Sequence, residues 1–228
     1  MLKLLMIQAD LVTGIDNMPV QKEGLKFIDL AIKGGWLMIP IVALSIVAMY
    51  IFFDRYFFIK KAGKSDPGLF EKVKMYITSG KIDAAIALCR SDSSPASRML
   101  EKGISRIGRP LNDVNTAIEN VGNFEISKLE KGLPILASAA GGAPMLGFLG
   151  TVTGMVRAFY DMSEAGSNVD IIILSAGIYE AMVTTVAGLI VGITAYFAYN
   201  ILVTEIGKVV SKMEITTSEF MDLLNEPV

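Results

Sequence analysis

The sequence predicts an all-α integral membrane protein, in which three transmembrane helices are extended by cytoplasmic helices. Hydrophobic residues make up 52% of the 228-residue chain, and only 19% of its residues are charged, against roughly 25% in soluble domains. Three segments almost lack charge, and each reaches the roughly 20 apolar residues that a spanning helix needs. They are Gly34–Phe53, Gly132–Val156 and Ile171–Thr204, the last with one charge, Glu180. Buried core helices of a soluble protein are the less favoured interpretation.

The lysines and arginines indicate how the chain is oriented. Fourteen of the 21 lie in 54–131, and none lies in 161–170. Positive charges near helix ends stay on the cytoplasmic side, so we expect an external N-terminus and a cytoplasmic C-terminus. The expected parts are an external or interfacial segment (1–32), the first span (33–58), a cytoplasmic helical domain (59–131), the second span (132–160), an external loop (161–170), the third span extending into the cytoplasm (171–204) and a cytoplasmic tail (205–228).

The N-terminal segment is expected to remain in the mature chain. Its apolar part, Leu4–Ile7, is shorter than the roughly 7–15 residues of a secretory signal, and we expect an amphipathic segment on the membrane surface. Aromatic residues mark both ends of the first span, as membrane interfaces favour. Trp36 lies at the outer end, and five aromatic residues between positions 52 and 58 lie at the inner end.

The cytoplasmic domain is predicted to be helical throughout. Its expected helices run from Pro67 to Gly80, across KIDAAIALCRSD, from Pro95 to Gly108 and from Pro110 to Lys131, because proline opens helices and glycine ends them. Acids are interspersed among its bases, so we expect a solvated face and no nucleic-acid partner. The single cysteine, Cys89, lies on an apolar helix face and is expected in the core.

The glycine-rich stretch GGAPMLGFLGTVTGMVRAF, in the second span, raises the question of a phosphate-binding loop. A P-loop needs a lysine after its second glycine, and no lysine occurs between Lys131 and Lys208. The glycines also lack the spacing of a dinucleotide fingerprint. The chain has no histidine, and no nucleophile–base pair or metal set is visible. We therefore expect no enzyme activity, no metal site and no cofactor.

On a helix, the small residues of this stretch form one face, and the third span carries a matching one. Such faces allow close helix packing, and their hydroxyls can bond across the interface or line a polar interior. Both interpretations are open for the threonines. The expected packing residues are Ala143, Gly147, Gly150 and Gly154 with Ala181, Gly188 and Gly192, and each face has a threonine near its middle, Thr151 and Thr185. Thr153 falls on the other side of the second helix.

Glu180 favours a polar interior, because acids inside spans are costly and usually functional. Thr184 follows one turn later on the same helix face. Glu180 and Thr151 are expected at a similar depth. A structural acid bound to a neighbouring helix is the alternative for Glu180. Arg157 is expected to anchor the outer end of the second span, either by extending toward the membrane surface or by pairing with Asp161; a role in transport is the less favoured alternative.

The segments APMLGFLGTVTGM and IYEAMVTTVAGLIVGITAYFAYN resemble the second and third transmembrane helices of the ExbB/TolQ/MotA proton-channel family. The three-span plan resembles the ExbB/TolQ branch, and ExbB more than TolQ. The resemblance implies that Thr151, Glu180 and Thr185 are the family's pathway residues, and Thr184 joins them as a neighbour of Glu180.

The resemblance also implies an oligomeric ring in the bacterial inner membrane, a homopentamer that holds single-span ExbD- or TolR-type partners in its pore. The partner would carry a protonatable aspartate, and TonB or TolA would transmit the work to the outer membrane. Protons would be the transported ion. A TolQ-like role in the Tol-Pal system and a non-conducting membrane scaffold are the alternatives.

Overall fold

The computed structural model describes residues 34–64, 68–164 and 171–225. The expectations for residues 1–32, and those for most of the loop 161–170, lie outside this part. Every regular element in the described part is a helix, so the all-α prediction is confirmed there. The helices are α3 (Met38–Ala62), α4 (Leu69–Thr78), α5 (Ile82–Ser91), α6 (Pro95–Ile104), α7 (Leu111–Glu130), α8 (Leu133–Glu164) and α9 (Ile171–Asn225).

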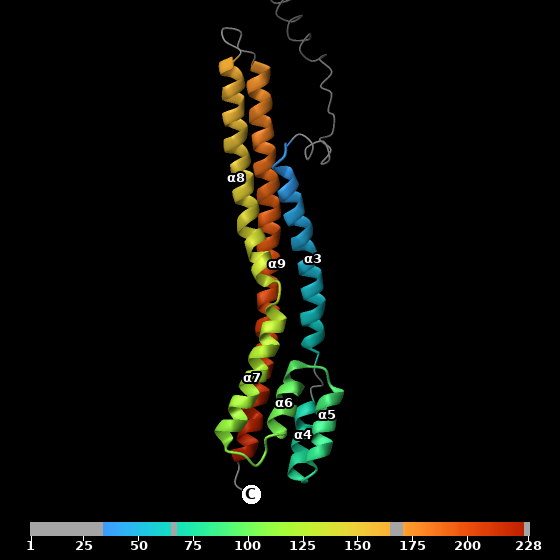
Figure 1. Cartoon of the computed structure of the whole chain (residues 1–228). Helices are drawn as coiled ribbons and strands as arrows, with labels where there is room; N and C mark the ends of the chain where they lie inside the picture. The colour runs from blue at the N-terminus through green and yellow to red at the C-terminus, as the bar shows by residue number, and fades with distance from the viewer. Residues whose placement is uncertain (1–33, 65–67, 165–170, 226–228) are drawn as a thin grey trace, which may run out of the picture.

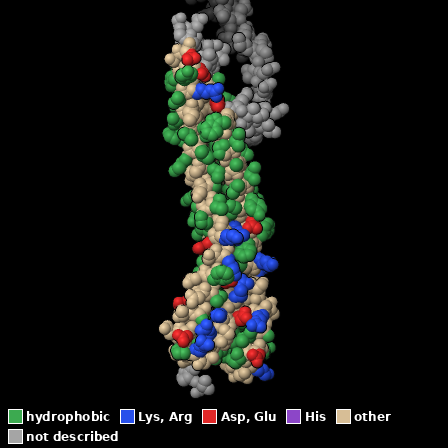
Figure 2. Space-filling model, viewed as in Figure 1, with side chains coloured by type: hydrophobic (Ala, Val, Ile, Leu, Met, Phe, Trp, Pro, Cys, Tyr) green, Lys and Arg blue, Asp and Glu red, His purple; other side chains and the backbone are tan. Residues whose placement is uncertain are grey.

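The helices form an elongated rod, as Figure 1 shows. Helices α8 and α9 run antiparallel along one half of it, and α3 lies beside α9. In the other half, α7 continues the line of α8, and the short helices α4–α6 pack beside the last part of α9. Three helical stretches, one each through α3, α8 and α9, are long and apolar enough to cross a membrane. Apolar side chains cover the half of the rod that contains α3 and α8, and charged side chains gather on the half that contains α4–α7 (Figure 2).

Helix α9 continues far beyond its apolar run. It has 55 residues and is therefore about 82 Å long at ~1.5 Å per residue. The sequence set the start of the expected cytoplasmic tail at residue 205, and the helix continues through this tail to Asn225. The reason is that this part is amphipathic, and Ile206, Val209, Met213 and Phe220 are buried in the core of the charged half.

A short break separates α7 from α8 at the boundary expected between the cytoplasmic domain and the second span. Gly132 has a φ of 90°, a conformation that costs glycine little and other residues much. Lys131, with φ −55° and ψ 124°, has the backbone of the first central residue of a type II turn, and Pro134 lies in the first turn of α8, where its missing N–H costs no hydrogen bond. The chain therefore changes helix without changing direction.

The charged half has its own core, built where α4–α7 meet the end of α9. Four of its side chains are almost completely buried: Leu100, Ile104, Ile118 and Phe220. Cys89 is also buried, as expected, and burial with the nearby acids raises the pKa of its thiol to about 11.

A buried carboxylate ties α6 to α7. The Glu125 side chain is only 4% exposed, and it binds Arg98 Nη2 at 2.6 Å and Lys128 Nζ at 2.7 Å. Burial alone would raise the pKa of Glu125, but the two hydrogen bonds and charges outweigh it and lower that pKa below its usual value. The ionised carboxyl therefore stabilises the fold above its unfolded pKa, and this contribution disappears as the pH falls through the folded value.

The contact between α8 and α9 depends on glycines. A Cβ atom on Gly188 would lie 2.5 Å from Ala143 O and 2.9 Å from Gly147 Cα. Both are backbone atoms, which cannot rotate away as a side chain would. The two helix backbones therefore approach to a distance that only glycine permits at this position.

We expect Glu125→Gln to lower the stability of the protein at neutral pH by about 1–3 kcal/mol, because a charged partner of two buried hydrogen bonds is lost. Thermal unfolding in detergent would measure the loss. The difference from wild type should shrink as the pH falls below 4.5, the ordinary carboxyl value. Glu119→Gln is the matched control, since Glu119 is exposed on the same helix. An equal loss in both variants would contradict this account.

We expect Gly188→Ala to lower the thermal stability by about 1–3 kcal/mol, the usual cost of overpacking. Gly141→Ala, in α8, adds the same methyl group where nothing lies within 4 Å, and should leave stability unchanged or slightly higher. The paired measurement separates contact from helix propensity. Unchanged stability in Gly188→Ala would show that the backbones can separate without cost.

Candidate ion-pathway site in the paired helices

The small residues predicted on the two spans meet along one seam between α8 and α9. In it, Gly147 faces the backbone of Thr184, Thr185 and Gly188, and Gly154 faces Ala181. Gly192 accommodates the ring of Pro144, which lies in the interior of α8. Ala143 and Ala181 are 0% and 2% exposed. The remaining small-residue contacts place Gly150 against Thr184 and Gly177 against Ala158.

Thr185 bonds directly across this seam. Its hydroxyl donates to Gly147 O at 2.9 Å, so a side chain of α9 is fixed to the backbone of α8. Thr151 donates to Phe148 O, within its own helix, at 2.6 Å. Both threonines are half-buried. Because a hydroxyl has two acceptor lone pairs besides its one donor, both oxygens can still accept a hydrogen bond.

Glu180 lies in a small cavity on the side of the seam that faces α3. The cavity holds about 60 Å³ and is bounded by the start of α3 and by both helices of the seam. A volume of this size is sufficient for at least one water molecule. Its lining residues are Gly34, Trp36, Leu37, Gly150, Thr153, Gly154, Arg157, Glu180 and Thr184.

Gly35, in the turn before α3, lies directly against the Glu180 carboxyl. A Cβ atom at Gly35 would collide with Glu180 Oε1. The residue also has a φ of 66°, a left-handed conformation that favours glycine. Glycine is therefore favoured at position 35 for two reasons: its backbone has a positive φ, and a side chain there would collide with the Glu180 carboxyl. The turn before α3 therefore positions Glu180, a role that the sequence did not reveal, since it placed Gly34 and Gly35 inside the first span.

The structure brings Glu180 and Thr184 together but separates them from Thr151 and Thr185. Residues two apart on a helix point about 160° apart, and residues five apart about 140° apart. Since Thr153 and Glu180 line the cavity, Thr151 and Thr185 lie on the opposite flank of the seam. We call the two sides the cavity flank and the open flank. The sequence had grouped all four residues in one pathway.

Three further residues differ from their expected positions or surroundings. Thr153 lines the cavity with Glu180, whereas the sequence set it apart from the site. Arg157 lines the same cavity, and no ion pair between it and Asp161 forms in the described part of the chain. Thr184 is 2% exposed and donates to Ala181 O at 2.8 Å, so its hydroxyl is already bound within its own helix.

Glu180 and Thr151 nevertheless lie close in depth. Gly150 faces Thr184, and Gly154 faces Ala181. Thr151 is therefore level with the turn of α9 that follows Glu180, about one helical turn further into the bundle.

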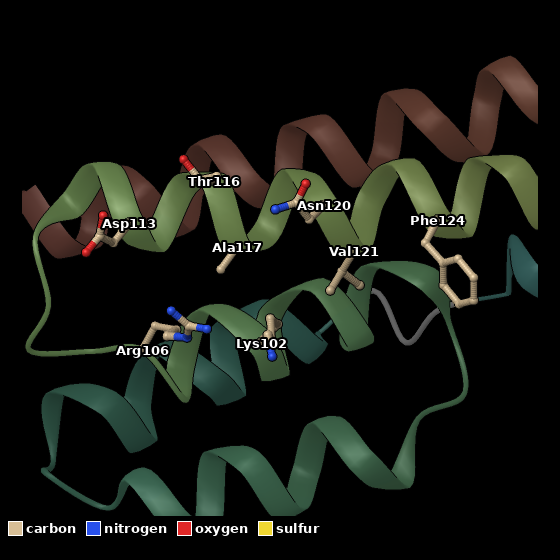
Figure 3. Close-up of a pocket in the computed structure, with 8 residues that line it drawn as sticks. All are labelled: Lys102, Arg106, Asp113, Thr116, Ala117, Asn120, Val121 and Phe124. Carbon is tan, nitrogen blue, oxygen red and sulfur yellow. The ribbon is translucent and has the colours of Figure 1, made fainter.

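A larger groove lies outside the apolar helices, between α6 and α7 (Figure 3). It holds about 560 Å³. Lys102 and Arg106 come from the α6 side, Asp113 lies at one end and Phe124 at the other. These mixed charges belong to the charged half of the rod, so the groove is separate from the membrane site.

The chemistry at the membrane site is limited to one carboxyl, one guanidinium and several hydroxyls. No cluster of three His, Cys, Asp or Glu side chains that could hold a metal occurs in the described ranges. The cavity can bind water, and the threonine hydroxyls can exchange hydrogen bonds with a carboxyl group. A titratable group on the open flank would have to come from another chain or helix.

Several known proteins are similar to this chain. ExbB-like 1, a biopolymer transport protein of Synechocystis sp., is 29% identical over 189 residues, which cover 78% of this chain and 71% of that protein. The ExbB homologue of Methanothermobacter thermautotrophicus is 27% identical, over 80% of this chain and 65% of its own length. The Tol-Pal system protein TolQ of Pseudomonas aeruginosa is 24% identical, over 84% and 87% respectively.

The chain also matches a known protein family across the helices that form the site. The model of the MotA/TolQ/ExbB proton channel family matches residues 91–215, which is more than half of the chain. The match extends from the end of α5 through the seam to the charged part of α9, so it includes both flanks of the site. The chain belongs to the MotA/TolQ/ExbB proton channel family.

Proposed function

We propose that this chain is the channel subunit of an inner-membrane complex that uses the proton-motive force to energise outer-membrane processes. It would act in the manner of ExbB, with an ExbD-type partner, and drive TonB-dependent uptake. The observation that carries the proposal is the open flank, where two threonine oxygens can accept hydrogen bonds beside a closely packed seam. Family membership supports proton transport, and two of the relatives carry ExbB in their names.

The open flank is suited to a carboxyl group that changes charge. When such a group is protonated, it can donate a hydrogen bond to Thr151 Oγ1 or Thr185 Oγ1. After it loses the proton, Thr151 can rotate its hydroxyl away from Phe148 O and donate to the carboxylate instead. Either state is therefore hydrogen-bonded, which lowers the cost of a charge inside the membrane. The single-span partner would supply the carboxyl.

The cavity flank would contribute a second polar site. Glu180 and Arg157 share a cavity large enough for water, and Thr153 adds a hydroxyl to its wall. Glu180 would tune the polar route from this side of the seam. Gly35 would keep the carboxyl in position. Within one subunit, the seam separates the polar residues of the cavity flank from those of the open flank.

The proposed assembly is the one that the family resemblance implies. Subunits would form a homopentamer whose seams surround the partner helices, with the external N-terminus in the periplasm and the end of α9 in the cytoplasm. A TolQ-like role in the Tol-Pal system is the second candidate, because relatives named TolQ match over much of the chain. Binding of the purified protein to an ExbD-type or a TolR-type partner would distinguish the two roles. A non-conducting scaffold would bind a partner without passing protons.

We expect Thr151→Val to reduce proton flux about 10–100-fold, because one hydrogen bond to a charged group is lost. Flux would be measured in liposomes that contain the protein with its ExbD-type partner. Thr194→Val is the matched control, since that hydroxyl also bonds only its own helix, at Ile190 O, far from the open flank. Assembly should be normal in both variants. Wild-type flux in Thr151→Val would contradict the role of the open flank.

We expect Gly35→Ala to reduce flux as strongly as Glu180→Gln does, because the added methyl group displaces the Glu180 carboxyl. Gly80→Ala controls for backbone strain. Gly80 has a similar φ of 72°, but nothing lies within 4 Å of an added Cβ. If Gly80→Ala impaired flux equally, strain alone would explain the loss. If Gly35→Ala conducted normally, the turn would have no role in positioning Glu180.

A further inference from the structure

A basic pocket lies between the end of α3 and the middle of α9, away from the seam. It holds about 730 Å³. Lys60 and Lys64 line it from α3, and Lys208 and Lys212 line it from α9, against a single acid, Glu205. Four ammonium groups around one carboxylate make this pocket attractive to an anion.

The pocket lies at the level where the apolar surface of the rod ends. Arg55 follows the uncharged run of α3, and its Nη1 donates to Lys128 O, just before α8, at 3.3 Å. On α9, Glu205 is the first charge after the apolar run. All three spans thus become charged at one level, and Figure 2 shows Lys and Arg side chains gathering there. This is the level of lipid headgroups.

Existing contacts shape the pocket without neutralising it. Lys212 Nζ donates to Gly63 O at 3.2 Å, which connects α9 to the end of α3. Lys208 binds Glu205 at 2.5 Å, and Lys60 lies over the Tyr56 ring at 5.3 Å. The single carboxylate therefore offsets one of the four lysines, and the pocket retains a positive charge between two fixed helices.

An apolar strip continues the lysine face of α3 into the membrane. Ile46, Met49, Phe53 and Phe57 step along α3 at intervals of three and four residues, and Lys60 and Lys64 extend the same row. These four apolar residues line a groove of about 540 Å³. From Ile46 to Phe57 the helix rises about 16 Å, which is close to half of the ~30 Å hydrocarbon core.

We propose that the pocket and the strip together bind an anionic glycerophospholipid, with the phosphate among the four lysines and an acyl chain along α3. Basic pockets between transmembrane helices at the membrane surface recognise such headgroups. A soluble phosphate would contact only the lysines and leave the apolar strip uncovered. A zwitterionic lipid brings its own cation, which the lysines repel. The lipid would join α3 to α9 at the base of the membrane-spanning part.

Lipid binding to the full-length protein in neutral detergent tests this proposal, with native mass spectrometry as the readout. Phosphatidylglycerol should bind saturably, at one high-affinity site per chain, and phosphatidylcholine should bind at least about tenfold more weakly. Glycerol 3-phosphate and inorganic phosphate, added in excess, should not displace the lipid. Displacement by either anion would identify a soluble-anion site and overturn the lipid assignment.

Two pocket variants, each with a control, locate the site. Lys64→Gln with Lys208→Gln should weaken phosphatidylglycerol binding about tenfold or more, whereas Lys61→Gln with Lys131→Gln removes the same charge outside the pocket and should not. Ser211→Asp places an acid in the pocket and should act like the first pair, and Ser218→Asp, further along α9, is its control. Equal losses in pocket and control variants, or no loss in either, would overturn the proposal.

Discussion

The close approach of the α8 and α9 backbones is the constraint on which the rest of the site depends. It requires glycine where Gly147 meets Gly188, because any larger residue would meet backbone atoms. The contact sets the register of the two helices, and this register places Thr185 within hydrogen-bond distance of Gly147 O. It also divides the polar residues between two flanks, since residues beside the seam must point to one side or the other. The packing of the two helices therefore also determines where the polar side chains lie.

A seam of this kind favours a rigid subunit. The seam itself is built from small residues, so it lacks long side chains that could adjust to a sliding neighbour, and one cross-helix hydrogen bond fixes the register of the two helices. Interfaces built in this way have discrete arrangements and do not deform continuously. In the proposed motor, the moving element would then be the partner helix at the open flank, and the channel subunit would present fixed hydroxyls to a carboxyl that moves past them.

Much of this structure could be predicted from the sequence, because charge, proline and glycine act locally. The absence of charge located the three spans, and Gly80, which has a positive φ, lies just past the end of α4 as expected. Gly108 was a poorer guide, because α6 already ends at Ile104. The separation of Glu180 from Thr151 could not be predicted, because it depends on how α8 and α9 pair in space and on which side of them the turn before α3 lies. The same is true of Gly35, whose neighbour is 145 positions away along the chain. The continuation of α9 through 205–225 depends on burial against α6 and α7, which the local pattern does not include.

Cross-linking tests the central claim most directly, namely that the open flank faces the partner and the cavity flank faces α3. In a Cys89→Ala background, a short thiol cross-linker would be applied to membranes that contain the complex, with a cysteine beside the partner's membrane aspartate. Thr151→Cys should cross-link to the partner, and Thr153→Cys should instead cross-link within the chain to Leu37→Cys, which lines the same cavity. Partner cross-links from Thr153→Cys and none from Thr151→Cys would contradict the account.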